Sequence, residues 1–234
     1  MWTARTRPRA DGRPDPTLGQ PVRGLVGPFL LGGLFAGIPV GAVALFRPAT
    51  AIPLVGGLVY VFALAVPAEE LAKWLAVRLT AYRSADFGLV VDGAVYGAMA
   101  GLGFATLENA VFVGLPVIRS AGAVTLADAA GVATGRMLAG PGDVVYGALT
   151  GYYLGLARFD QADRGPIVVK GLLLAVAVHG THNVVVTYGP ALAGVGRLKL
   201  WAAAAVGLSG LVLVAVVRKV ERYRRLYHEA YPAL

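Results

Sequence analysis

Long apolar stretches, separated by short polar segments, make up most of the chain. Six of them can be drawn, at residues 25–46, 51–82, 93–117, 141–157, 167–188 and 198–217. A helix needs about 20 apolar residues to cross the hydrocarbon core of a bilayer. The pattern therefore predicts an all-α fold, a polytopic transmembrane helix bundle with about six to seven spans.

Two parts of this pattern are less regular. The stretch 51–82 is longer than a bilayer requires, so it is tilted, extends past the membrane, or breaks into two helices at Pro67. Residues 119–140 are only weakly apolar and are expected to form an interfacial or partly inserted segment ahead of a span that starts near Pro141. Within that segment, Thr125 and Asp128 have the spacing of a capping box that opens a short helix.

Ionisable and amide side chains interrupt four of the predicted spans. A charge near the bilayer centre costs about 2.5–3.5 kcal/mol, so such groups are functional by default. Counted along the helices, the key groups lie roughly 18–24 Å from the cytoplasmic ends of their spans, at one common depth. This shared depth predicts a single buried site, built from Glu69, Glu70, Lys73, Glu108, Asn109, Asp143, His179 and Asn183.

Glycines recur every four residues in the third and fourth spans. Small residues at this spacing let two helices approach closely in a membrane. The short echo between residues 95–98 and 145–148, Val-Tyr-Gly-Ala in both, is expected to reflect this packing need. The glycines concerned are Gly93, Gly97 and Gly101 in one span and Gly147, Gly151 and Gly155 in the other.

The composition supports a membrane protein. Of 234 residues, 57% are hydrophobic and only 15% are charged, and the net charge is +8. Fifteen of the 21 lysines and arginines flank one side of a six-span arrangement, which predicts cytoplasmic N and C termini and contacts with membrane lipid, with no nucleic-acid partner. The domains expected are a disordered basic tail (1–23), a transmembrane domain (24–218) and a basic cytoplasmic tail (219–234). The chain has no cysteine, which excludes disulfides and thiolate chemistry.

Carboxylates and an imidazole in a low-dielectric pocket suit two kinds of chemistry. A buried carboxylate is a usable general base for water, and imidazole and amide groups can hold a developing oxyanion, which fits amide hydrolysis. The same groups fit proton relay in a proton-coupled transporter. The sequence contains no zincin, serine hydrolase or phosphate-loop motif. From the residues alone, both readings stay open, as does a non-catalytic module that binds membrane helices.

Three motifs, in order, resemble the PrsW family of intramembrane proteases, over about residues 55–185. They are Glu69-Glu70-x-x-Lys73, Phe104-x-x-x-Glu108-Asn109 and His179-x-x-x-Asn183. The family is distantly similar to the CAAX-prenyl endopeptidases. The resemblance implies a multi-pass protein of a bacterial cell membrane that hydrolyses a single-pass membrane protein substrate, for example an anti-sigma-factor-like protein.

The resemblance also implies roles for these residues. Glu69 would be the general base on water, with Glu70 supporting it. Glu108, beside the supporting residue Asn109, would orient the water. The oxyanion pocket would be formed by His179 and Asn183.

Three further expectations concern charge and metal. Lys73 would pair with a carboxylate and hold the helix register. Asp143 stands where family members usually have a histidine, and it would carry a proton or pair with Arg136 or Lys73. A metal-free reaction is favoured, and the alternative is zinc bound by Glu70, Glu108 and His179. His182 points off the His179 face and is expected to be a core histidine bonded to a backbone carbonyl.

Overall fold

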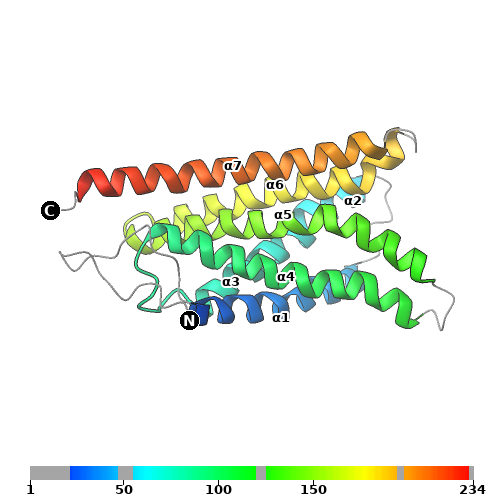
Figure 1. The fold of residues 1–234 in the computed structure, drawn as a ribbon, viewed down its shortest axis with the longest axis horizontal. Coiled ribbons are helices and arrows are strands. Elements are labelled where there is room, and N and C mark those ends of the chain that lie inside the picture. Colours follow the sequence, from blue (N-terminus) through cyan, green and yellow to red (C-terminus); the bar gives the residue numbers. More distant parts are fainter. Residues whose placement is uncertain (1–21, 47–54, 120–124, 194–197, 232–234) are drawn as a thin grey trace.

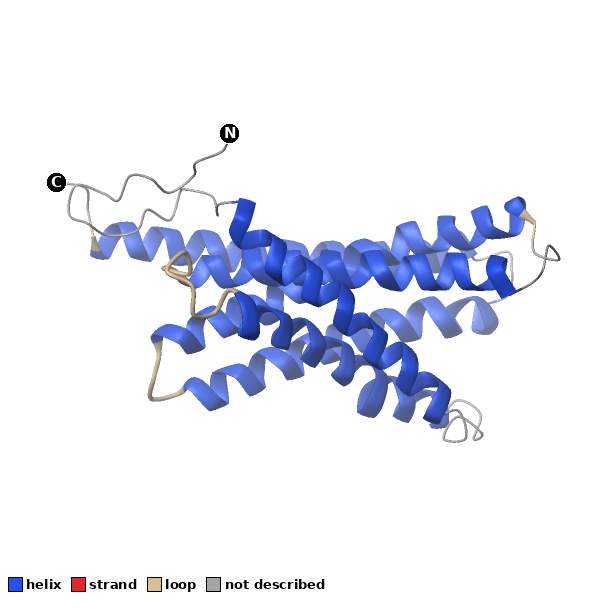
Figure 2. Cartoon of the chain, turned by 90° about the horizontal axis from the view of Figure 1, so that it is seen from below, coloured by secondary structure: helices blue, strands red, loops and turns tan. Residues whose placement is uncertain are grey.

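The computed structural model describes residues 22–46, 55–119, 125–193 and 198–231, and these parts contain helices and no strands. The helices lie side by side in an elongated bundle (Figures 1 and 2). Five of the described helices are long and apolar enough to cross a membrane, so the prediction of an all-α, multi-pass membrane protein is confirmed. The elements are α1 (Val22–Phe46), α2 (Val55–Val59), the π-helix η2 (Tyr60–Ala65), α3 (Val66–Thr80), α4 (Val90–Arg119), α5 (Leu126–Phe159), α6 (Arg164–Ala193) and α7 (Leu198–Ala230).

The start of α1 and the end of α7 point toward the same end of the bundle, and α7 extends beyond the other helices there (Figure 1). The predicted basic tail 1–23 is outside the described residues up to position 21, and its last two residues begin α1. The predicted C-terminal tail 219–234 continues α7 as helix to Ala230.

The long second stretch is one helix rather than two broken at Pro67. The α2, η2 and α3 segments follow one another without interruption, and the backbone widens into a π-helix between Tyr60 and Ala65. At the end of that segment the N–H of Val66 donates to the carbonyl of Val61, five residues back. Pro67, which has no N–H, occupies the first turn of α3, where a missing donor is tolerated. The wider turn thus precedes Glu69 and Glu70 directly.

The segment ahead of Asp143 also differs from the prediction. It is not a separate interfacial helix, because α5 runs unbroken from Leu126 to Phe159 with Pro141 inside it. The predicted capping box is confirmed: the N–H of Asp128 donates to Oγ1 of Thr125 at 3.2 Å, and the N–H of Thr125 donates to Oδ2 of Asp128 at 3.0 Å. Arg136 therefore lies within the long helix α5, whereas it was expected in an interfacial or partly inserted segment that precedes the span.

The two predicted glycine stripes pack against each other. A Cβ added to Gly97 would overlap the carbonyl oxygen of Gly147, and one added to Gly151 would overlap that of Gly93. The backbones of α4 and α5 are thus in direct contact, as the repeated small residues predicted. This contact fixes how far apart Glu108 on α4 and Asp143 on α5 are held.

Candidate active site

Glu70 lies at the centre of a polar cluster in the interior of the bundle. Its side chain is fully buried, on the first turns of α3 that follow the π-helix. Oε1 accepts a hydrogen bond from Nζ of Lys73 at 2.7 Å and lies 2.8 Å from Nδ1 of His179. Oε2 accepts from the hydroxyl of Thr150 at 3.0 Å. Glu70 therefore links α3, α5 and α6, and its contacts suit a role in holding other groups in place.

Lys73 is the cation of this cluster. Its side chain is buried, and Nζ donates to Oδ1 of Asp143 at 2.6 Å as well as to Glu70. Nζ also lies 4.8 Å from the centre of the Phe104 ring. The predicted pairing of Lys73 with a carboxylate is present. Of the two partners considered for Asp143, Arg136 and Lys73, it is Lys73 that pairs with it.

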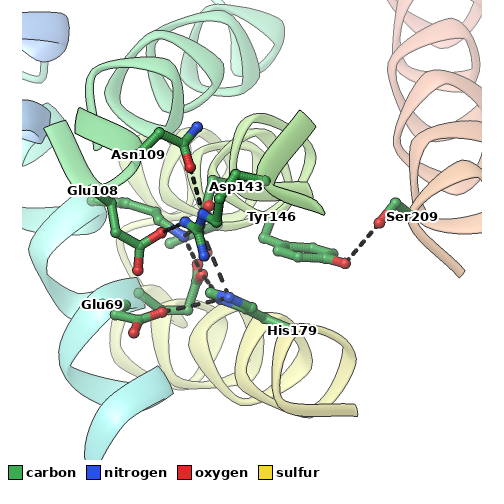
Figure 3. Close-up of polar contacts among 11 residues, drawn as sticks. Glu69, Glu108, Asn109, Asp143, Tyr146, His179 and Ser209 are labelled. Carbon is green, nitrogen blue, oxygen red and sulfur yellow. Dashed lines mark hydrogen bonds and ion pairs between the residues drawn. The ribbon is translucent and has the colours of Figure 1, made fainter. Parts of the chain in front are cut away.

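Glu69, Asp143 and His179 come together from three helices. One donor atom from each lies within 4.8 Å of the others. Nε2 of His179 is 3.4 Å from Oε2 of Glu69 and 3.9 Å from Oδ1 of Asp143. All three side chains are buried, and Figure 3 shows Glu69 and His179 facing each other below Asp143. The convergence inferred from their common depth is therefore found in the fold.

Glu108 and Asn109 form a second polar group with Arg136. The Arg136 guanidinium donates to Oε2 of Glu108 in a short ion pair, and its Nε donates to Oδ1 of Asn109 at 2.6 Å. The guanidinium also lies 4.8 Å from the Phe112 ring. The Arg136 cation of α5 thus fixes the position of Glu108, which Figure 3 shows above Glu69.

A cavity of about 560 Å³ connects these two groups. Glu69 and Glu108 both line it, as do Arg136 and Asn183. Most of the remaining wall is apolar and includes Val111, Phe112 and Leu115 of α4 and Val186 of α6. An apolar cavity with a few converging polar groups is the usual form of a ligand or substrate site.

A family model described as PrsW family intramembrane metalloprotease matches residues 20–218, which is most of the chain. The chain belongs to the PrsW family. Proteins named Protease PrsW are similar to it: that of Halalkalibacterium halodurans is 30% identical over 118 residues, covering 50% of this chain and 49% of the relative. The Bacillus subtilis protein is 34% identical over 123 residues, covering 51% and 50%.

This PrsW-family chain spans about half the length of the curated relatives that it matches. No solved structure matches it. The resemblance drawn from three short motifs is thus confirmed as family membership by a match that reaches far beyond them.

The donor set fits the metal that the family description implies. One imidazole nitrogen and two carboxylates are ligands that zinc accepts, and they are close enough to share an ion. The other ring nitrogen of His179 contacts the Glu70 carboxylate, the kind of outer partner that orients metal-bound histidines in many sites. The set differs from the zinc ligands expected from sequence, because Glu69 and Asp143 take the places given to Glu70 and Glu108.

Several residues of the candidate site were not predicted from the sequence. Tyr146 stacks on His179 and Thr150 binds Glu70; both share a helix face with Asp143, at i+3 and i+7, a signal that could have found them. His182 is buried as expected, but the predicted bond to a backbone carbonyl is not found among the described residues. Its ring packs edge-on against Tyr146 instead.

Proposed function

We propose that this PrsW-family chain is an intramembrane endopeptidase that hydrolyses a peptide bond of a membrane-spanning substrate. The observation that carries the proposal is the meeting of Glu69, Asp143 and His179 beside a cavity whose wall includes Glu69. The substrate proposed is a single-pass membrane protein, for example an anti-sigma-factor-like protein. Residues 24–218 form the catalytic domain, with both termini in the cytoplasm.

Glu69 is the carboxylate best placed to act on water. Among the described residues, no lysine or arginine lies within ion-pair distance of it, whereas Glu70 and Asp143 share Lys73 and Glu108 is paired with Arg136. It also lines the cavity, so a water molecule there can reach it. In a reaction without metal, a carboxylate in this position takes the proton from the attacking water and passes it to the leaving amine.

The other polar groups position the substrate and its developing charge. Asn183 lines the same cavity as Glu69, so its amide can donate to the oxyanion of the tetrahedral intermediate. Nε2 of His179 faces the same region. The paired Lys73 and Glu70 hold α3 in register with α5 and α6, which keeps Glu69 at the cavity wall.

In a second version of the reaction, a divalent cation, proposed as zinc, would be held by Glu69, Asp143 and His179. Glu69 and His179 would then be ligands of the ion rather than a free base and an oxyanion donor. When bound there, such an ion lowers the pKa of water and polarises a carbonyl group. The donor geometry and the family description together favour this version over the metal-free reaction that the sequence suggested. Lys73 neutralises Asp143, and Glu70 holds the ring of His179, in either version.

The test compares membranes of a bacterial host that expresses either the wild-type chain or Glu69→Gln. The free N termini of the membrane proteins are labelled, and the labelled peptides are identified by mass spectrometry. Peptides cut within or beside membrane spans should appear with the wild type and be absent with Glu69→Gln. Glu229→Gln, an exposed residue of α7, is the matched control and should cleave normally. Equal cleavage by Glu69→Gln would exclude Glu69. Solute flux driven by a pH gradient in proteoliposomes, without cleavage, would favour a transporter.

A further inference from the structure

The imidazole of His179 is constrained at its edge and on its face. At the edge, Nδ1 lies 2.8 Å from Glu70 and Nε2 lies 3.4 Å from Glu69. On the face, the Tyr146 ring is stacked, with 4.7 Å between ring centres and 22° between planes. The second side-chain torsion of histidine, χ2, has a broad energy profile, so contacts at the ring edge alone still allow the ring plane to tilt. A stacked ring removes that freedom, because rotation would drive the imidazole into its neighbour.

Tyr146 is itself fixed by a helix that lies outside the site. Its phenolic oxygen is 2.9 Å from Oγ of Ser209 on α7, and both side chains are buried. A buried phenol needs a hydrogen-bond partner, so this contact fixes the position of the hydroxyl end of the Tyr146 side chain. Tyr146 also meets the His182 ring edge-on, with 5.9 Å between the ring centres. Figure 3 shows Tyr146 extending from beside His179 toward Ser209.

We infer that Tyr146 is a positioning residue for His179, and that Ser209 of α7 holds Tyr146 in place for this purpose. The inference rests on the proposed peptidase function for its effect on rate, but the contact itself can be tested without activity. It gives α7, which otherwise packs on α5 through residues such as Val212 and Val216, a defined part in the reaction.

Four variants separate stacking from hydrogen bonding. Tyr146→Leu removes the aromatic face, whereas Tyr146→Phe keeps it and loses only the bond to Ser209. Ser209→Ala removes the same hydrogen bond by changing its other partner. The double variant, Tyr146→Phe with Ser209→Ala, tests whether the two substitutions act through this one bond. Tyr152→Phe is the control, because Tyr152 is a buried tyrosine of the same helix that packs on Tyr153.

The first readout is structural and independent of catalysis. The full-length protein in detergent micelles is labelled with ¹³C-histidine, and the ring C–H signals are recorded by NMR. The chain has three histidines, so His179→Gln and His228→Gln assign the spectrum. A ring stacked on Tyr146 is shifted upfield by the aromatic ring current. Tyr146→Leu should abolish that shift for His179, and Tyr146→Phe, Ser209→Ala and Tyr152→Phe should keep it.

The second readout is the split between kcat and KM, measured in proteoliposomes on a fluorogenic peptide that carries a cleavage site found by the N-terminal screen. Loss of an outer-shell partner commonly lowers activity by about 10–100-fold, and we expect this fall in kcat for Tyr146→Leu with KM nearly unchanged. Tyr146→Phe and Ser209→Ala should lower kcat by the same smaller factor, and the double variant no further.

The outcomes separate the two proposals. If the wild-type chain cleaves nothing, the peptidase assignment fails, while the NMR shift still decides whether Tyr146 holds His179. An unshifted His179 signal in the wild type, or a normal kcat in Tyr146→Leu, would overturn the positioning role. A lowered kcat in Tyr146→Leu with an unchanged His179 shift would also overturn it. If Tyr146→Leu does not fold, additive losses in Tyr146→Phe and Ser209→Ala would overturn it on their own.

Discussion

Nζ of Lys73 and Oδ1 of Asp143 lie 2.6 Å apart and join α3 to α5 in the interior of the bundle. Lys73 also meets Glu70 at 2.7 Å, so one buried cation serves two carboxylates from different helices. Removing one member of a buried ion pair leaves an uncompensated charge, which is far more destabilising than removing both. Asp143, at the position where the resemblance led us to expect a histidine, is the partner of Lys73 in this chain.

Lys73→Met should lower the free energy of unfolding by about 3–5 kcal/mol, because it leaves Glu70 and Asp143 without their cation. Lys73→Met combined with Asp143→Asn should recover part of that loss. The measurement is unfolding in a mild detergent, followed by tryptophan fluorescence.

Lys170→Met, at an exposed lysine of α6, controls for loss of a positive charge. If Lys73→Met and Lys170→Met lower the free energy of unfolding equally, the Lys73–Asp143 contact contributes nothing to stability. The same conclusion would follow if the losses from Lys73→Met and Asp143→Asn simply add in the double variant.

Arg136→Lys should weaken the connection between α4 and α5 beside the cavity. A lysine cannot keep the forked contact that Arg136 makes with Glu108 and Asn109. We expect a loss of about 1–3 kcal/mol in the free energy of unfolding, since Glu108 keeps an unsatisfied oxygen near the cavity. Cleavage should fall mainly through KM, because the cavity wall changes and Glu69 does not. Arg119→Lys, at the exposed end of α4, should leave both quantities unchanged.

Gly97→Ala should destabilise the bundle by about 1–3 kcal/mol, since its methyl group would overlap the backbone of Gly147 and separate α4 from α5. Gly210→Ala in α7 is a matched control, because a Cβ at Gly210 meets nothing within 4 Å. Thermal unfolding midpoints of the two variants provide the comparison. A Gly97→Ala protein as stable as Gly210→Ala would mean that the two helices do not touch through their glycines.

Purified protein prepared with zinc should contain about one zinc ion per chain, and His179→Ala should contain far less, because the donor set loses its only nitrogen. Plasma emission spectrometry measures the content. Asp160→Asn, which follows α5 in an exposed turn, controls for nonspecific binding and should keep the metal. Full cleavage by metal-depleted protein would instead assign water activation to Glu69 alone.

The helices and the level of the site could be predicted from sequence, whereas the partners within the site could not. Apolar length gives the spans, and the shared depth of Glu69, Glu108, Asp143 and His179 indicated where they meet. Contacts also depend on how each helix is rotated about its axis. In a membrane the outer face is apolar as well as the inner one, so the hydrophobic pattern does not reveal that rotation.

Arg136 illustrates this limit. Its sequence position suggested an interfacial or partly inserted segment, and Asp143 was considered as a partner for it. The unbroken course of α5 instead places Arg136 beside Glu108. The glycine stripes of α4 and α5 are an exception, because a small residue every fourth position marks the face that meets another helix.

The π-helix at Tyr60–Ala65 has a consequence for how this protein can tolerate insertions and deletions. A π turn closes over five residues rather than four. Loss of one residue from it would restore an ordinary helix and rotate α2 by about 100° relative to Glu69. The Phe62 ring would then leave the surface of Gly180, beside His179, and the Tyr188 hydroxyl would lose its place against Gly57. We therefore expect the length of this six-residue segment to be under stronger selection than most of its side chains.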